Sequence, residues 1–334
     1  MKVHVQLDSA PGAGAARSHE LAETGAGGLF TFEGPHDVFF PLVEAASAVD
    51  LDLMTNVAIA FPRSPMHLAH SANDLQLLSR GHFRLGLGSQ IKPHIEKRYS
   101  ATWSRPAARM KETVAAVKAI FTAWENTSTL NFRGEFFTHT LMPPTFDPGP
   151  NPYGPPPILM GALGPVMTRT AAEVADGLLV MPFHTQRHFL ERTLPAVDAG
   201  LRESGRTRDE FTIIPQVIVG VGRGEDQLAA AARGVRALLS FYGSTPAYRP
   251  VLDVEGWGEV QPELNALSKR GGYTEMASLI TDPMLTTLAV VGTPEECATE
   301  IRRRFGEHAD EVCCYFPGYD VEPSDVASMI SSLT

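Results

Sequence analysis

Residues 51–90 contain the pattern that decides the fold, LDLMTNVAIAFPRSPMHLAHSANDLQLLSRGHFRLGLGSQ. Segments 51–60 and 83–87 are short and apolar with turn residues at their ends, which predicts two strands. Between them, 65–79 repeats apolar residues every three or four positions after a Ser-Pro start, which predicts a helix. Strand, helix and strand in this order form the unit from which parallel α/β sheets are built.

The same alternation continues on both sides of this segment. The region 10–27 is short and rich in Gly and Ala, so we expect loop to replace part of the first helix. About eight βα units favour a closed (β/α)₈ TIM barrel, as a single domain over 1–334, rather than an open sheet. The further expected strands are 2–7, 28–32, 158–160, 177–180, 211–219 and 311–316, and the further helices are 41–49, 106–124, 166–175, 187–204, 225–241 and 293–305.

Two stretches interrupt the alternation and are expected as insertions at the C-terminal face of the barrel. Segment 126–157 is rich in Pro and Gly and contains a hairpin pattern around Arg133 and Gly134. We expect this segment to lie over the barrel mouth. Segment 242–288 is too long for an ordinary loop, which predicts a lid or an interface element.

The composition limits the class of partner. The net charge is −10, which disfavours nucleic acid or an anionic membrane as the main partner and favours a small molecule. The first residues show no leader pattern and no run reaches membrane-spanning length, so a cytoplasmic location is expected. Cys297, Cys313 and Cys314 lack the spacing of zinc or redox motifs and are expected to be buried, reduced thiols.

Chemistry in such a barrel is expected directly after the strands, at their C-terminal ends. Asp8 follows the first strand, and residues 33–37 (EGPHD) bring an imidazole and two carboxylates after the second. We take His36 as the candidate catalytic or cofactor-contacting residue and Asp8 and Glu33 as candidate substrate contacts. The alternative for His36 is a structural role, in which it caps the following helix or bonds a loop carbonyl.

Small and polar residues follow the third and fourth strands. Asn56 and Val57 end the third strand, where the backbone can face a flat ring. The fourth strand ends at Gly88, Ser89 and Gln90, where backbone amides can approach a phosphate. A cationic stretch follows and favours an anionic ligand, although a solvated basic face is an equal alternative; its members are Lys92, His94, Lys97 and Arg98.

The fifth strand ends in a second segment of small residues. Gly161 and Ala162 directly precede a helix, whose N-terminus favours anions. Together the two segments suggest one phosphate-bearing cofactor. His184 and His188 are one helical turn apart, but no third ligand accompanies them, so no metal site is expected. The segment 220–224 (GVGRG) lacks the full spacing of a nucleotide-binding loop and is expected to be a turn.

Several stretches together resemble a known family. They are 81–96 (GHFRLGLGSQIKPHIE), 103–104 (WS), 106–110 (PAARM), 133–136 (RGEF) and 291–297 (VGTPEEC). On these motifs the chain resembles the luciferase-like monooxygenases, and specifically their coenzyme F420-dependent oxidoreductases of actinobacterial type. The resemblance covers almost the whole chain.

The resemblance implies a deazaflavin ring over the barrel, near His36 and against a bulge at Asn56 and Val57 that often contains a non-prolyl cis peptide. Its phosphate tail would be held by Ser89 and Gln90 on one side and by Gly161 and Ala162 on the other, with His94 nearby. The implied reaction is hydride transfer between coenzyme F420 and a small organic substrate, with His36 as proton donor or substrate polariser.

The resemblance leaves other functions open. Ile91 stands where some deazaflavin enzymes carry an acidic residue, so a sugar-phosphate dehydrogenase is not expected. An FMN-dependent monooxygenase that uses O2 is the first alternative, and a non-catalytic, cofactor-binding barrel subunit is the second. A homodimer is expected through the helices after the second and third strands, where 41–48 (PLVEAASA) is rich in small residues.

Overall fold

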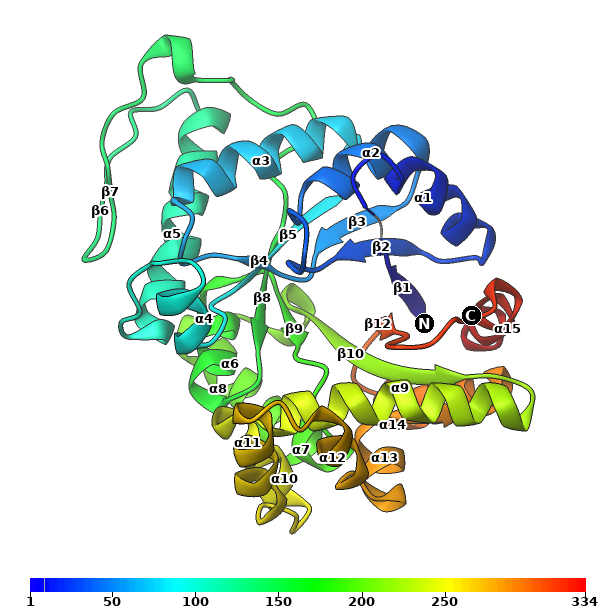
Figure 1. Cartoon of the computed structure of the whole chain (residues 1–334). Helices are drawn as coiled ribbons and strands as arrows, with labels where there is room; N and C mark the ends of the chain where they lie inside the picture. Colours follow the sequence, from blue (N-terminus) through cyan, green and yellow to red (C-terminus); the bar gives the residue numbers. More distant parts are fainter. Residues whose placement is uncertain (9) are drawn as a thin grey trace.

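The computed structural model describes residues 1–8 and 10–334. Within these residues, eight parallel strands form a closed ring, because β1 pairs with β12 and β10 pairs with both β9 and β12 (Figure 1). The predicted (β/α)₈ barrel is therefore confirmed. In order around the ring, the strands are β1 (Lys2–Gln6), β2 (Gly28–Thr31), β3 (Asp52–Thr55), β5 (Phe83–Gly88), β8 (Ile158–Ala162), β9 (Gly177–Val180), β10 (Thr212–Val221) and β12 (Glu311–Tyr315).

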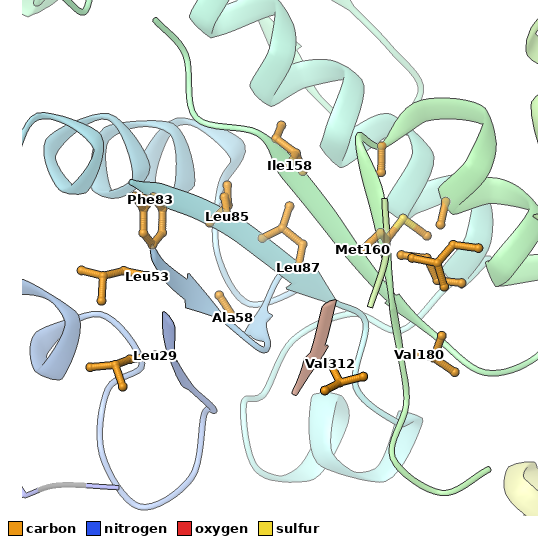
Figure 2. Packing of buried hydrophobic residues seen from close by; sticks show 14 of the residues in the cluster. Leu29, Leu53, Ala58, Phe83, Leu85, Leu87, Ile158, Met160, Val180 and Val312 are labelled. Carbon is orange, nitrogen blue, oxygen red and sulfur yellow. The ribbon is translucent and has the colours of Figure 1, made fainter. Parts of the chain in front are cut away.

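The strands are apolar on both faces because the barrel has two hydrophobic layers. Successive side chains point to opposite faces, so Leu29 belongs to the outer layer and Phe30 to the inner one. Leu53 and Met54 divide in the same way. Figure 2 shows part of the outer layer, where side chains of neighbouring strands pack together. This double burial explains why the strands are continuous apolar runs rather than alternating ones.

The helices surround the ring and cover its outer face (Figure 1). Many begin with a proline in the first turn, where the missing N–H costs nothing. The structure also contains α15, which the sequence analysis did not identify. The surrounding helices are α1 (Gly14–Glu23), α2 (Phe40–Ala48), α3 (Pro65–Leu78), α5 (Pro106–Glu125), α6 (Pro165–Val174), α7 (Gln186–His188), α8 (Leu194–Ser204), α14 (Pro294–Phe305) and α15 (Pro323–Leu333).

The first helix is formed, which corrects the expectation that loop partly replaces it. α1 is ten residues long despite its Gly and Ala content. Its start is held by Glu44 of α2, whose carboxylate accepts the backbone N–H groups of Gly12 (2.7 Å) and Gly14 (2.6 Å). Tertiary contacts at the helix start thus compensate for weak intrinsic propensity.

Two other predicted elements are divided. Strand 51–60 becomes β3 and β4 (Ala58–Ile59), with a cis peptide bond between Asn56 and Val57. The predicted helix 187–204 contains a π-helical turn, Phe189–Thr193, between α7 and α8. A short helix, α4 (Lys92–Lys97), lies within the basic stretch.

The first insertion does not lie over the mouth, which corrects our expectation. It forms the predicted hairpin, β6 (Phe132–Arg133) and β7 (Thr138–His139), on the outer side of α5 (Figure 1). Glu112 of α5 accepts three backbone N–H groups of the hairpin turn, at 2.6 to 2.9 Å. Asn151, near the other end of the insertion, bonds to Asn73 of α3 and to Glu125 of α5. The hairpin turn approaches the rim, since Arg109 lies over both Phe137 of the turn and Phe61.

The second insertion is helical and packs beside the mouth. Its helices share an apolar core with α9 (Glu225–Gly243) and with Phe183 and Met181, which follow the C-terminal end of β9. Figure 1 shows them gathered along α9. The chain then returns through β11 (Val290–Gly292), which extends the sheet beside the end of β10. The inserted helices are α10 (Arg249–Val254), α11 (Val260–Lys269), α12 (Tyr273–Ser278) and α13 (Asp282–Leu288).

An ionic network closes the opposite, N-terminal end of the barrel. Arg84 of β5 bonds to Glu311 of β12 at 2.8 Å and lies 3.4 Å from Asp52 of β3, while His4 Nε2 of β1 lies 2.6 Å from Glu311. Burial acts to raise the pKa of Glu311, but the hydrogen bonds with His4 and Arg84 outweigh it and lower this pKa to about 2. The end opposite the mouth is thus filled by charged protein groups.

The three cysteines are buried and unpaired, as expected. Burial raises the pKa of both Cys297 and Cys314 to about 12, so the thiols stay protonated at neutral pH. Within residues 1–8 and 10–334, no helix is long and apolar enough to cross a membrane.

Candidate functional site

Three of the predicted cofactor residues, Val57, Gly88 and Gly161, lie together at the mouth. A Cβ added to Gly88 would lie 2.4 Å from Val57 Cγ2, and one added to Gly161 would lie 3.1 Å from Val57 Cγ1. The two glycines therefore make room for the Val57 side chain. Their small size has a packing reason in addition to the predicted approach of a ligand.

Asn56 brings an unpartnered amide to the same place. Its side chain is buried beside the Cys313 thiol, a weak polar group, and neither Nδ2 nor Oδ1 makes a hydrogen bond of normal geometry among the described residues. Its backbone is held, because its N–H donates to the Thr31 carbonyl at 2.6 Å. A buried amide without partners is costly, by about 1–3 kcal/mol, and such a group in a native fold calls for an explanation. The polar edge of a ligand would satisfy it.

Two residues beside Asn56 were missed by the sequence analysis. The Tyr315 hydroxyl donates to Gln216 Oε1 at 2.8 Å and lies 3.3 Å from the Asn56 carbonyl oxygen. Burial raises the pKa of Tyr315 well above its usual value, so the hydroxyl remains a donor. The only signal in the sequence was a polar side chain within each of two apolar strands.

The predicted phosphate-facing segments have different local structures. Ser89 Oγ donates to the Gln90 carbonyl at 3.1 Å, and Gln90 Oε1 accepts the Ile91 N–H at 3.0 Å, so both side chains bond within their own loop. His94, on α4, is half-buried and its Nδ1 has no partner among the described residues.

The other segment ends β8 and leads into α6. Gly161 is half-buried and Ala162 is buried at the end of the strand. Gly164 caps α6 without a side-chain bond, and a Cβ there would meet nothing within 4 Å. The first turn of α6 therefore faces open space with its backbone amides uncapped by a side chain, which suits an anion.

His36 is exposed on the loop after β2. The helix that follows, α2, has Phe39 as its N-cap and no side-chain cap, and Asp37 accepts the Phe39 N–H at 2.8 Å. The capping alternative for His36 is therefore wrong. Its catalytic role stays a prediction.

The two candidate substrate contacts differ. Asp8 is exposed at the end of β1. Glu33 points into the protein instead, with an 8% exposed side chain. Its carboxylate accepts hydrogen bonds from Ile59 N (2.8 Å), Arg63 Nη1 (2.6 Å) and the Tyr99 hydroxyl (3.1 Å). The structure thus gives the Glu33 carboxylate three protein partners, which argues against its assignment as a candidate substrate contact.

His184 and His188 are both buried, and the His184 ring lies 5.5 Å from the Phe305 ring. Burial lowers the pKa of each to about 4, so both are neutral at pH 7. In the part of the chain that the structure describes, no group of three or more His, Cys, Asp or Glu side chains is placed to hold a metal ion.

Comparisons with known proteins agree with this architecture. The family model "Luciferase-like monooxygenase" matches residues 22–310. An uncharacterised protein of Mycobacterium tuberculosis is 46% identical over 297 residues, 89% of this chain and 87% of its own. The 5,10-methylenetetrahydromethanopterin reductase of Archaeoglobus fulgidus is 30% identical over 243 residues, 71% of this chain and 68% of its own.

Solved structures share the fold at low sequence identity. The coenzyme F420-dependent tetrahydromethanopterin reductase of Methanopyrus kandleri aligns with a TM-score of 0.80 at 17% identity, over 98% of this chain and 96% of its own. The oxygenating constituent of 3,6-diketocamphane monooxygenase from Pseudomonas putida, in complex with FMN, aligns with a TM-score of 0.68 at 14% identity, over 99% and 97%.

Proposed function

The chain belongs to the luciferase-like monooxygenase family, and from this premise we propose that it is a coenzyme F420-dependent oxidoreductase that transfers a hydride between the deazaflavin and a small organic substrate. The observation that carries the proposal is the buried Asn56 amide at the mouth, with both polar atoms unpartnered among the described residues. A protein of Mycobacterium tuberculosis named "Putative coenzyme F420-dependent oxidoreductase", which is 27% identical over 282 residues, supports the choice of cofactor.

The residues at the mouth fit a ring with a phosphate-bearing tail. Asn56 offers one donor and one acceptor to the polar edge of a planar ring, and Val57 offers an apolar wall. The uncapped start of α6 after Gly164 and the loop at Ser89 and Gln90 offer backbone amides to phosphate.

When bound, the deazaflavin supplies a carbon centre that gives or accepts a hydride. The chain supplies orientation and a proton. His36 is exposed at the mouth, and we assign it the proton transfer to or from the substrate oxygen. The apolar inner layer below Val57 keeps water away from the ring face.

FMN is the alternative cofactor, since one structural neighbour is a monooxygenase in complex with FMN. An FMN-bound form would use O2, and the same Asn56 and Val57 surface would face its ring. A barrel that binds neither group would be a non-catalytic subunit.

Fluorescence quenching of the purified protein with coenzyme F420 and with FMN tests the assignment. F420 is expected to bind more tightly, and Gly161→Val is expected to weaken binding at least tenfold because it crowds Val57 and the proposed phosphate segment. Gly224→Val is the matched control, because its new Cβ would meet only Gln227 Oε1, at 3.9 Å.

Two outcomes would overturn the choice of cofactor, and a third would overturn the assigned site. Tighter binding of FMN together with oxygen-dependent turnover would assign the chain to the monooxygenases. Binding of neither cofactor would leave the non-catalytic role. Equal affinities for Gly161→Val and wild type would place the cofactor elsewhere on the barrel.

We also propose a homodimer that pairs through α2 and α3. These neighbouring helices expose large apolar side chains, with Phe40 64% and Val43 39% exposed on α2 and Leu78 45% exposed on α3. Sedimentation velocity should show a dimer that Val43→Glu dissociates. A monomeric wild type at micromolar concentration would refute this arrangement.

A further inference from the structure

The Glu33 carboxylate joins three segments of the mouth. Glu33 itself follows β2, on the loop that carries His36. The Ile59 N–H and Arg63, which bond to Oε2 at 2.8 and 2.6 Å, lie on β4 and before α3. The Tyr99 hydroxyl, which bonds to Oε1 at 3.1 Å, lies beyond α4. One carboxylate therefore connects the segments that follow β2, β3 and β5.

Arg63 strengthens this connection by holding both ends of the His36 loop. Its guanidinium bonds to Glu33 at 2.6 Å and lies 3.3 Å from Asp37 Oδ2, and these two carboxylates flank His36 in the sequence. The same Nη1 also donates to the Ile59 carbonyl at 3.0 Å. The planar guanidinium can serve several acceptors at fixed angles, which a lysine cannot do.

The segment after β5 makes a second contact with the same loop. Arg98 Nη2 donates to the Gly34 carbonyl at 2.9 Å, beside the bond between Tyr99 and Glu33. Burial and the neighbouring Glu33 carboxylate raise the pKa of Tyr99, so its hydroxyl keeps the proton that it donates. This segment also contains Ser89 and Gln90, so its position and that of His36 are linked.

We propose that Glu33 is a positioning residue, which fixes the His36 loop relative to the cofactor by binding Arg63 on one side and Tyr99 on the other. The proposal rests on the proposed function, because it assigns Glu33 a part in presenting His36 to a bound deazaflavin. Glu33 does not touch the reacting atoms. It acts through the loop whose two ends Arg63 holds.

The first test measures the loop in the cofactor-free protein. Hydrogen exchange of residues 33–39 should accelerate roughly tenfold in Glu33→Gln and in Tyr99→Phe, since each removes hydrogen bonds that hold the loop. Tyr153→Phe is the matched control, because Tyr153 is a half-exposed tyrosine outside this network. Unchanged exchange in Glu33→Gln would overturn the proposal whatever cofactor the protein binds.

The second test is a double-mutant cycle on affinity for oxidised coenzyme F420. Tyr99→Phe should weaken F420 binding about tenfold in the wild-type background and less than twofold in a His36→Ala background. In the His36→Ala background the hydrogen bond from Tyr99 to Glu33 has no imidazole to position. Equal losses in both backgrounds would show that Tyr99 affects binding without His36, through the fold or through the segment of Ser89 and Gln90, which overturns the inference. If wild type does not bind F420, the proposed function fails, and the exchange experiment still decides whether Glu33 holds the loop.

Discussion

Val57 occupies the space that two glycines leave open at the ends of β5 and β8. Neither Gly88 nor Gly161 has a positive φ, so backbone conformation does not require glycine at these positions. Glycine is required because the Val57 side chain lies close to both backbones. From the sequence alone, both glycines are expected to contact a phosphate. The structure adds a packing role that can be tested separately from cofactor binding.

Gly88→Ala should lower the free energy of unfolding by about 1–3 kcal/mol, because the new Cβ would lie 2.4 Å from Val57 Cγ2 and force the mouth to shift. Urea unfolding of the cofactor-free protein measures this change. Gly224→Ala, whose Cβ meets no atom closer than 3.9 Å, should cost less than Gly88→Ala, at most the roughly 1 kcal/mol of a weakened helix N-cap. Equal stability of the two variants would contradict the packing role.

At the scale of elements, the hairpin of β6 and β7 is held by a side chain of α5. The turn presents the N–H groups of Glu135, Phe136 and Phe137 to one carboxylate, that of Glu112. Arg109 lies over the rings of both Phe137 and Phe61, so the hairpin also contacts the rim of the mouth through α5. The hairpin is thus attached to the outer side of the barrel through α5.

Glu112→Ala should release the hairpin while the barrel stays folded. The three N–H groups would lose a charged acceptor, so exchange at residues 132–139 should rise and proteases should cut there first. Glu125→Ala is the control, since Glu125 accepts the Asn151 N–H near the other end of the insertion and no hydrogen bond from the hairpin among residues 1–8 and 10–334. A hairpin as protected in Glu112→Ala as in wild type would show that side-chain packing holds it.

The turn after β9 gives the stability of the protein a pH dependence. Burial lowers the pKa of His184 to about 4, and its Nδ1 is paired with the Met181 carbonyl at 2.8 Å. Because this folded-state value is below the unfolded value near 6.5, the fold favours the neutral ring. The corresponding stability is present above pH 6.5 and is lost as the pH falls toward 4.

We expect His184→Asn to reduce the loss of stability between pH 6.5 and pH 4. The amide can still donate to the Met181 carbonyl and does not titrate, so the loss between pH 6.5 and 4 should be smaller than in wild type by roughly 3 kcal/mol. Urea unfolding at a series of pH values measures the difference. Parallel curves for the variant and wild type would mean that His184 is protonated without cost.

At the scale of the whole molecule, charges close one end of the barrel and leave the other for ligand binding. The network of His4, Asp52, Arg84 and Glu311 draws on β1, β3, β5 and β12, and it spans the seam where β12 meets β1. The side chains are 0 to 21% exposed, so water screens them little. The network therefore links β1 and β12, the first and last strands of the barrel.

Arg84→Met should lower the free energy of unfolding by about 2–4 kcal/mol, because Glu311 and Asp52 would keep their burial and lose a cation. The loss of Arg84 should also raise the pKa of Glu311 from about 2 toward its usual range, so acid unfolding should begin at higher pH. Arg17→Met, which removes an exposed pair with Glu20, should cost less than about 0.5 kcal/mol. Equal costs would show that the network is dispensable.

The sequence by itself determined the barrel and the end at which its site lies. The spacing of apolar residues and the positions of turn residues are local properties of the sequence. They predicted the eight strands, most helix starts and the small residues Gly88 and Gly161 at strand ends. β11 was missed because three residues carry little periodic signal. α15 was missed although Val326, Met329, Ile330 and Leu333 recur at helical spacing.

Only the tertiary structure decided which side chains meet. Tyr99 bonds to Glu33 across 66 residues, and Tyr315 approaches Asn56 across 259. Such pairs depend on the register of strands far apart in the chain, which no local pattern encodes. The same reason explains why the sequence favoured a substrate contact for Glu33 and a position over the mouth for segment 126–157. Its partner, Glu112, lies on a helix whose surface only the fold brings into place.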